Sequence, residues 1–266
     1  MSAARSQSAF PQVVLFCSGR AGVGKSTALA NLAWTAAEQG ISCLLWDADL
    51  AMPSLHLLFG LSPLATAADA YLGNAAIESI PVQPRPGLWL LPERAGTAAA
   101  AAHLSQAFPT LLGRLLARFA PQLVLIDTPP GWSELLLSMG RFAHTWAIVF
   151  ADDIGSILDA YGLLKTLLSC NDNAPKQLGL VLTHVLDDPD AASLAVKFNT
   201  VVQHFFGKRL PVWASLPYDP RYREALVQQR LVVELFPQTP TARAYRQLLT
   251  ALVPSTETLA YEAASL

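Results

Sequence analysis

Apolar residues along the chain gather into short runs that alternate with longer segments of helical periodicity. Continuous apolar runs predict strands at residues 13–17, 41–46, 88–91, 123–126, 146–150 and 178–182, with a last short strand at 211–214. Runs without polar interruption are typical of parallel strands that are buried on both faces. The pattern therefore favours a parallel sheet over an antiparallel sheet with one wet face.

Helices are expected between most of these strands. In residues 27–39, Leu29, Leu32, Ala33 and Ala36 form one apolar stripe, and Gly40 follows where a helix-ending glycine belongs. The other predicted helices cover residues 109–119, 134–141, 154–169, 191–206 and 241–252. Alternating strands and helices predict an α/β fold, with a mainly parallel sheet and helices on both faces. Ligands of such sheets bind at the carboxyl ends of the strands.

The composition indicates one large domain. The chain has 266 residues, of which 52% are hydrophobic and 14% are charged, so it can bury a sizeable core. We expect one domain over residues 11–253, flanked by flexible ends at 1–10 and 254–266. The alanine-rich run 96–102 is interpreted as a loop or a helix entry, since the strand–helix alternation resumes after it.

The net charge and the cysteine content further narrow the class of protein to which the chain can belong. The net charge of −2 argues against a globally basic nucleic-acid binder and leaves a local basic patch open. Cys17, Cys43 and Cys170 are widely spaced, which indicates buried thiols in a reducing compartment. No signal peptide is expected. The uncharged stretches 50–68 and 95–113 hold prolines and histidines, so neither predicts a membrane span, and a soluble cytoplasmic protein is expected.

The strongest chemical signal lies between the first strand and the first helix. Gly19, Arg20, Ala21, Gly22, Val23, Gly24, Lys25 and Ser26 fit the pattern G-x-x-x-x-G-K-[ST] of the phosphate loop, or Walker A motif. The glycines let successive backbone N–H groups turn toward an anion, and the following helix adds its positive end. Lys25 would reach the β- and γ-phosphates, and the Ser26 hydroxyl would bind Mg²⁺. This motif predicts a nucleotide site.

Acidic residues end two of the other predicted strands. Asp127 follows the apolar run 123–126, where a carboxylate beside a phosphate loop can hold Mg²⁺ through water. Asp47 and Asp49 follow the second strand. Asp49 is the candidate for orienting the attacking water, and Asp47 for the outer shell of the metal. The turn 128–131 is suited to sensing the γ-phosphate.

Together these motifs resemble the MinD/ParA family of deviant P-loop ATPases. The motifs that carry the resemblance are Arg20 to Ser26, Asp47 to Asp49, and Asp127 to Gly131, and the likeness runs over about residues 12–253. Within the family, stretches at residues 47–50, 57–61, 159–165, 219–225 and 240–244 are most similar to the flagellar-placement FlhG/FleN branch. The resemblance implies the P-loop NTPase (SIMIBI, MinD-like) fold.

The resemblance also implies a mechanism. Members bind Mg-ATP, form an ATP-dependent sandwich homodimer and hydrolyse ATP slowly as a spatial or numerical switch. A signature lysine crosses to the phosphates of the partner subunit, and here that position is Arg20, followed by Ala21 instead of glycine. Thr27 would line the nucleotide site, and Thr183 and His184 follow the strand that reads adenine. The opposing wall would be formed by Pro217, Tyr218 and Asp219.

The biological output stays open among three classes. Flagellar placement or number is one, with an unidentified partner in a surface machine and a contact with the inner membrane or cell pole. A ParA-type partitioner on DNA is the second, and a nucleotide-binding accessory subunit of a secretion or cellulose-synthase (BcsQ-like) assembly is the third. Residues 205–250 carry seven Lys or Arg and three Asp or Glu, a local excess of +4. A lipid or DNA contact and a solvated face are both compatible with it.

Overall fold

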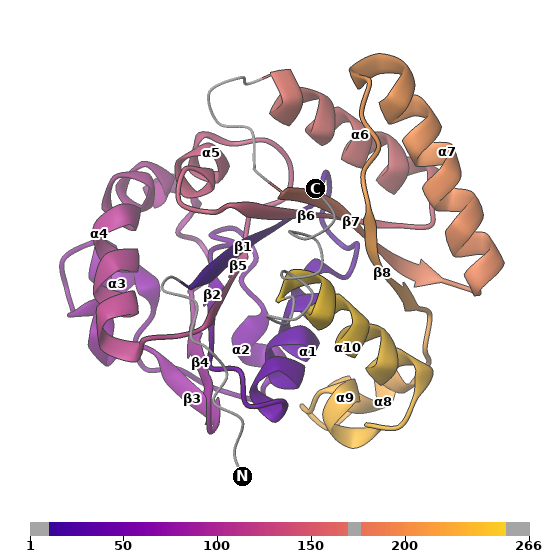
Figure 1. Cartoon of the computed structure of the whole chain (residues 1–266). Coiled ribbons are helices and arrows are strands. Elements are labelled where there is room, and N and C mark those ends of the chain that lie inside the picture. Colours follow the sequence, from indigo (N-terminus) through magenta and orange to yellow (C-terminus); the bar gives the residue numbers. More distant parts are fainter. Residues whose placement is uncertain (1–10, 170–176, 254–266) are drawn as a thin grey trace, which may run out of the picture.

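A computed structural model of the chain describes residues 11–169 and 177–253 (Figure 1). The expected flexible ends and Cys170 lie outside the described residues. The strands are β1 (Gln12–Cys17), β2 (Cys43–Asp47), β3 (Val82–Arg85), β4 (Leu88–Leu91), β5 (Leu123–Asp127), β6 (Thr145–Ala151), β7 (Gln177–Val185) and β8 (Val212–Pro217). The α-helices are α1 (Lys25–Glu38), α2 (Leu55–Leu58), α3 (Ala67–Tyr71), α4 (Ala101–Phe119), α5 (Glu134–Gly140), α6 (Ile154–Ser169), α7 (Asp188–Phe206), α8 (Arg221–Val227), α9 (Val232–Leu235) and α10 (Pro240–Leu252). Short 3₁₀ turns cover Ile77–Ser79 and Ala98–Ala100.

Within the described residues, the strands form one eight-stranded sheet in the order β3-β4-β2-β5-β1-β6-β7-β8. Every neighbouring pair is parallel except β3 and β4. Phe16 on β1 is in register with Asp127 on β5, and Asp127 is in register with Asp47 on β2. The carboxyl ends of these three strands therefore meet at one edge, as the α/β prediction requires.

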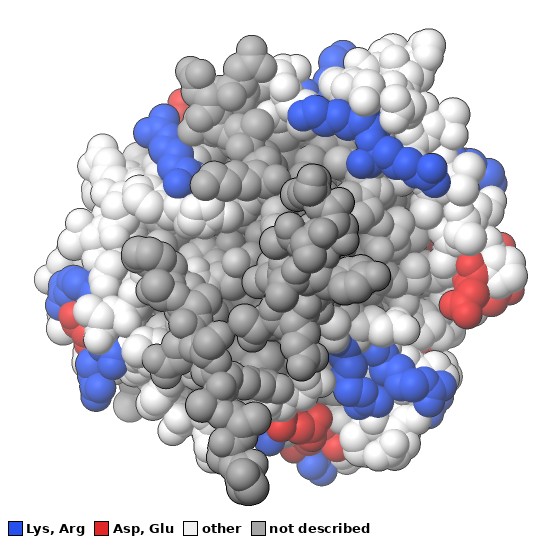
Figure 2. Space-filling model, viewed as in Figure 1, with Lys and Arg blue, Asp and Glu red and all other residues white. Residues whose placement is uncertain are grey.

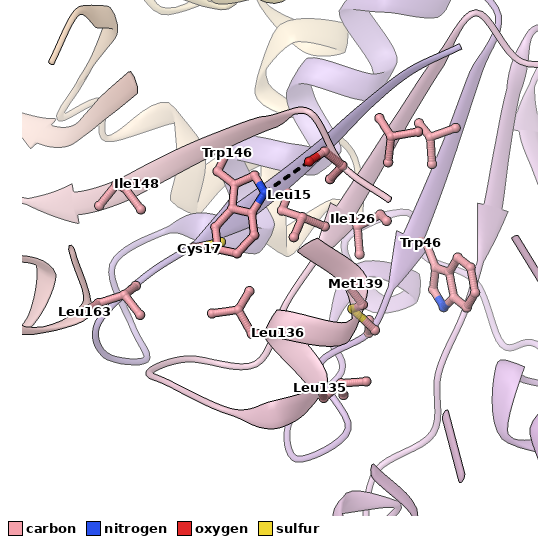
Figure 3. Packing of buried hydrophobic residues seen from close by; sticks show 14 of the residues in the cluster. Leu15, Cys17, Trp46, Ile126, Leu135, Leu136, Met139, Trp146, Ile148 and Leu163 are labelled. Atoms are coloured by element: carbon pink, nitrogen blue, oxygen red, sulfur yellow. Dashed lines mark hydrogen bonds between the residues drawn. The ribbon is translucent and has the colours of Figure 1, made fainter. Parts of the chain in front are cut away.

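Helices cover both faces of the sheet, which confirms the predicted fold class (Figure 1). Cys17, Trp46 and Trp146 pack on one face, against α4, α5 and α6 (Figure 3). The rings of Trp46 and Phe108 of α4 contact each other in a tilted arrangement with centroids 5.0 Å apart, and Trp146 Nε1 donates a hydrogen bond to the carbonyl of Ala143 (3.3 Å). On the other face, α1 and α10 pack together over the sheet. These two hydrophobic cores hold in place the carboxyl ends of β1, β2 and β5, where the phosphate loop, Asp47 and Asp127 lie.

The sequence pattern missed the short elements. Strand β3 is half-exposed at a sheet edge and contains Pro84, so it has neither a continuous apolar run nor a clean alternation. Helices α2, α3, α8 and α9 have four to seven residues, too few to show a helical period. Helix α4 begins at Ala101, eight residues before the predicted start. Pro109 lies inside it, and the Ser138 hydroxyl donates to the carbonyl of Ser105, which Pro109 cannot pair (2.9 Å).

Two further expectations concern the thiols and the uncharged stretches. Cys17 and Cys43 are buried, as predicted, and burial raises the pKa of the Cys17 thiol to about 12. Both thiols therefore stay protonated and act as small apolar side chains. Among the described helices, none has the length and apolar character needed to cross a membrane.

Candidate nucleotide site

The loop between β1 and α1 has the backbone shape of an anion cradle. Gly22 and Gly24 take left-handed conformations, with φ of +82° and +83°, which a side chain would strain. Gly24 is the N-cap of α1, and no side chain caps this helix end. The first N–H groups of a 14-residue helix and of the preceding loop are thus left to a ligand.

Lys25, the first residue of α1, forms an ion pair with Asp127 at the end of β5. The side chains are 6% and 0% exposed, so both charges are held inside the protein. Asp127 Oδ2 is buried and has no hydrogen-bond partner in the described structure. A buried carboxylate oxygen without a partner is costly, and a cation or its bound water would satisfy it. The donor set at this position therefore fits Mg²⁺.

Asp47 is the neighbour of Asp127 across the sheet. Its Oδ2 accepts hydrogen bonds from the backbone N–H groups of Ser54 and Leu55 (both 3.0 Å), and its Oδ1 accepts one from Asp49 (3.3 Å). Burial, followed by the nearby charge of Asp127, raises the pKa of Asp47 well above its ordinary value. Asp47 thus holds the 49–55 loop in place, and a cation beside the two carboxylates would offset their repulsion.

Asp49 lies in the loop that follows β2. Its Oδ1 accepts hydrogen bonds from the N–H groups of Ala51 and Met52 (both 3.1 Å), and the residue is 8% exposed. The carboxylate therefore shapes its own loop, a role that the sequence alone did not indicate.

The turn after β5 is tied to the phosphate loop. The Thr128 hydroxyl donates to the carbonyl of Phe16 (2.8 Å), and the Gly131 N–H donates to the carbonyl of Ser18 (2.7 Å). Gly131 has φ of +77°, the conformation for which glycine is suited. Because of these two hydrogen bonds, a movement of this turn would also move the residues at the start of the phosphate loop.

Arg20 projects from the phosphate loop toward the start of α6. Its Nη1 lies 3.5 Å from Asp153 Oδ1, and its Nε lies 3.9 Å from Asp159 Oδ2. All three side chains are about half-exposed. Ion pairs this exposed contribute little to stability, so the guanidinium is accessible to a second partner.

Gly19 sits where the loop passes the backbone of α6. A Cβ added here would lie 2.2 Å from the carbonyl carbon and oxygen of Asp159. We expect Gly19→Ala to destabilise the protein by about 3 kcal/mol, because the rigid helix backbone cannot move aside. Urea unfolding measures this.

Gly113, inside α4, serves as the control for Gly19. No atom lies within 4 Å of a Cβ built there, so Gly113→Ala should stabilise the protein by about 0.5–1 kcal/mol. Equal stability of the two variants would show that the loop does not pack on α6 as described.

A cavity of about 250 Å³ adjoins the phosphate loop. Thr183, His184, Pro217 and Tyr218 line it together with Gly24 and Thr27. The Thr183 hydroxyl donates to the carbonyl of Val23 in the loop (2.7 Å). His184 has φ of +57°, a strained conformation outside glycine, and such strain gathers at ligand sites. The structure thus brings the residues expected around adenine into one cavity at the start of α1.

Other residues of this cavity were missed by sequence reasoning. Asp219 was predicted in the wall of the site and lines the cavity, whereas no role in the site was predicted for Tyr222, Arg223 or Tyr245. The remaining lining residues that were missed are Leu216 and Pro220. Tyr245 comes from α10, and nothing in local spacing shows that this helix reaches the end of β8.

The basic excess of residues 205–250 is partly neutralised. Arg221 pairs with Asp219 (2.8 Å) and Arg230 with Glu234 (2.7 Å). On the face shown in Figure 2, the described basic side chains form several separate groups. This distribution favours a solvated face over a continuous track for DNA.

Comparison with known proteins identifies the family. The model of the CobQ/CobB/MinD/ParA nucleotide binding domain matches residues 14–232. The chain therefore belongs to the CobQ/CobB/MinD/ParA nucleotide-binding family, which confirms the resemblance to MinD/ParA proteins.

Two relatives and one solved structure are similar to the chain over most of its length. The chain is 30% identical to the antiactivator FleN of Pseudomonas aeruginosa, over 88% of this chain and 84% of FleN. It is 23% identical to the flagellum site-determining protein YlxH of Helicobacter pylori, over 94% of this chain and 84% of YlxH. The septum site-determining protein MinD of Pyrococcus horikoshii, solved with Mg-ADP, matches with a TM-score of 0.76 and 22% identity, over 92% and 97% of the two chains. The MinD likeness confirms the MinD-like P-loop fold.

Proposed function

We propose that this protein is an ATPase that binds Mg-ATP, dimerises on ATP and hydrolyses it slowly as a switch. The observation that carries the proposal is the buried pair of Lys25 and Asp127 at the mouth of the phosphate loop, with one Asp127 oxygen left without a partner. The adjoining cavity supports the proposal, since it leaves room for a base beside the phosphate loop. The Mg-ADP in the structure of the related MinD supports the same ligand class here.

Each part of the nucleotide has candidate partners. The loop from Gly19 to Gly24 and Lys25 would hold the phosphates. Ser26 and Asp127 would hold Mg²⁺, with Asp47 in its outer shell. When bound, Mg²⁺ neutralises charge on the β- and γ-phosphate oxygens. Thr27 and the cavity residues Thr183, His184, Pro217 and Tyr218 would enclose the sugar and base.

Hydrolysis needs a positioned water and more positive charge. We assign the water to Asp49, which lies in the loop after β2, the strand next to β5, and the added charge to Arg20 of the opposite subunit. The half-exposed guanidinium is held by weak ion pairs, so it is available to a partner chain. In-line attack on the γ-phosphate then needs little covalent chemistry from the protein beyond orientation and charge.

Replacement of Asp49 tests the water-orienting role. Asp49→Ala should bind ATP within about threefold of the parent, lose hydrolysis by about 100-fold and accumulate as an ATP-bound dimer. Phosphate release and light scattering measure these effects.

The loop-shaping role of Asp49 needs its own control. Asp49→Asn keeps an oxygen that accepts from Ala51 and Met52 but removes the charge. Hydrolysis should be lost in both variants. If Asn restores full turnover, Asp49 acts only by shaping the loop.

The biological output that we propose is control of flagellar placement or number from the cytoplasm, through a protein partner at the membrane or pole. FleN and YlxH support it, since YlxH is named for determining the site of the flagellum. Deletion of the gene should change the number or position of flagella, and restoration with a Lys25→Ala variant should fail to correct it. Normal flagella in the deletion strain would contradict the proposal.

A second candidate is a nucleotide-binding accessory subunit that hardly turns over. The observation that favours it is the contact of Arg20 with Asp153 and Asp159 of its own chain. In that case Mg-ATP would bind without dimerisation.

A further inference from the structure

The cavity beside the phosphate loop ends at two tyrosines from different helices. Tyr222 of α8 and Tyr245 of α10 both line it, and their hydroxyl oxygens are 2.7 Å apart. Tyr245 is 1% exposed, and Tyr222 is half-buried. One hydroxyl donates to the other, which leaves the pair one O–H donor and free lone pairs to offer to a ligand.

The other polar side chains of the cavity are already committed or lie at its rim. Both Asp219 oxygens are occupied, Oδ1 by the backbone N–H and Nε of Arg221 (3.0 and 2.8 Å) and Oδ2 by the Thr241 hydroxyl (2.5 Å). The Thr183 hydroxyl donates to the phosphate loop. His184 and Arg223 are exposed. Thr27, at the start of α1, offers a single half-buried hydroxyl beside the phosphate loop, whereas the tyrosine pair offers a donor and an acceptor side by side, and this pair is therefore the better match for a base.

We propose that the Tyr222–Tyr245 hydroxyl pair reads the base of the nucleotide and selects adenine over guanine. This inference rests on the proposed nucleotide function. One donor and one acceptor match N1 and the N6 amino group of adenine. Guanine can use the same two groups through O6 and N1–H, but its 2-amino group would then face the apolar wall of Leu216, Pro217 and Pro220. A buried amino group without an acceptor is what makes guanine the poorer ligand.

Binding measurements on conservative variants test the proposal. Tyr222→Phe should weaken Mg-ATP binding by about 10-fold, the effect of one hydrogen bond, and weaken Mg-GTP binding less, so the ATP preference falls. Tripolyphosphate, which has no base, should bind the variant and the parent equally. Calorimetry with the full chain measures all three ligands.

Two further variants separate base reading from support of the fold. Tyr222→Phe leaves the buried Tyr245 hydroxyl without its partner, whereas Tyr222→Phe with Tyr245→Phe removes both and should fold normally. The double variant should show the same loss of ATP preference. Tyr161→Phe, on α6 across the sheet, should change none of the three affinities.

Three results are informative. If the parent binds no nucleotide, the proposed function fails. If the parent binds ATP and the variants keep its ATP preference, the base is read by other groups and this inference is overturned. If tripolyphosphate binding falls as much as ATP binding, the pair only supports the site, which also overturns it.

Discussion

Lys25→Ala is expected to weaken ATP binding by at least about 100-fold. The ammonium lies at the start of α1, next to the loop whose N–H groups have no side-chain cap. A charge-assisted hydrogen bond is worth about 1.5–3 kcal/mol, and in the proposed site the buried lysine would make more than one, to two phosphates. Calorimetric titration with Mg-ATP measures the loss. A folded variant that binds ATP as tightly as the parent would place the nucleotide elsewhere.

The fold of this variant needs its own measurement. Lys25 is the ion-pair partner of Asp127, which is fully buried, and removing one member of a buried pair costs about 3–5 kcal/mol. Lys25→Arg keeps a positive charge beside Asp127 but changes the length and shape of the group that meets the phosphates. It should fold and still bind ATP poorly. Lys197→Ala, which removes an exposed lysine on α7, should change neither the stability of the fold nor the affinity for ATP.

The sequence predicted the fold well where the pattern was long and buried. Strands such as β5, in which all five residues are buried, leave a continuous apolar run that only a covered parallel strand explains. The position of Asp127 after such a run also placed it at the edge that carries the phosphate loop. Both inferences use periodicity and chain order alone, and for that reason they needed no tertiary contact.

The features of the site that the sequence did not predict depend on tertiary contacts, most of them between segments that are distant in the chain. Tyr222 and Tyr245 are 23 residues apart and meet only because α8 and α10 fold back on the end of β8. The Asp49 carboxylate is engaged by its own loop, and this geometry leaves no trace in residue spacing. Arg20 was predicted to serve a partner subunit, and its contacts with α6 are equally invisible in the sequence.

Arg20→Ala is expected to separate ATP binding from the steps that follow it. The phosphate loop and Lys25 remain, so the variant should bind ATP within about threefold of the parent. The variant lacks the guanidinium that would reach the phosphates of the partner subunit, where negative charge builds up during hydrolysis. An arginine in such a position raises the rate of phosphoryl transfer by a factor on the order of 10³. Light scattering with ATP and a phosphate-release assay measure dimerisation and hydrolysis, and both should fall.

The ion pairs of Arg20 in its own chain do not oppose this expectation. At N–O distances of 3.5 and 3.9 Å between half-exposed groups, they contribute at most about 1 kcal/mol, far less than a phosphate contact would return. Arg20→Lys, which places the residue usual in the family at this position, should recover part of the rate. As a control, Arg141→Ala, which removes an exposed arginine at the end of α5, should keep the dimerisation and the hydrolysis rate of the parent. An Arg20→Ala protein with the dimer and rate of the parent would mark Arg20 as a solvated loop residue, and the chain would then be better described as a nucleotide-holding accessory subunit.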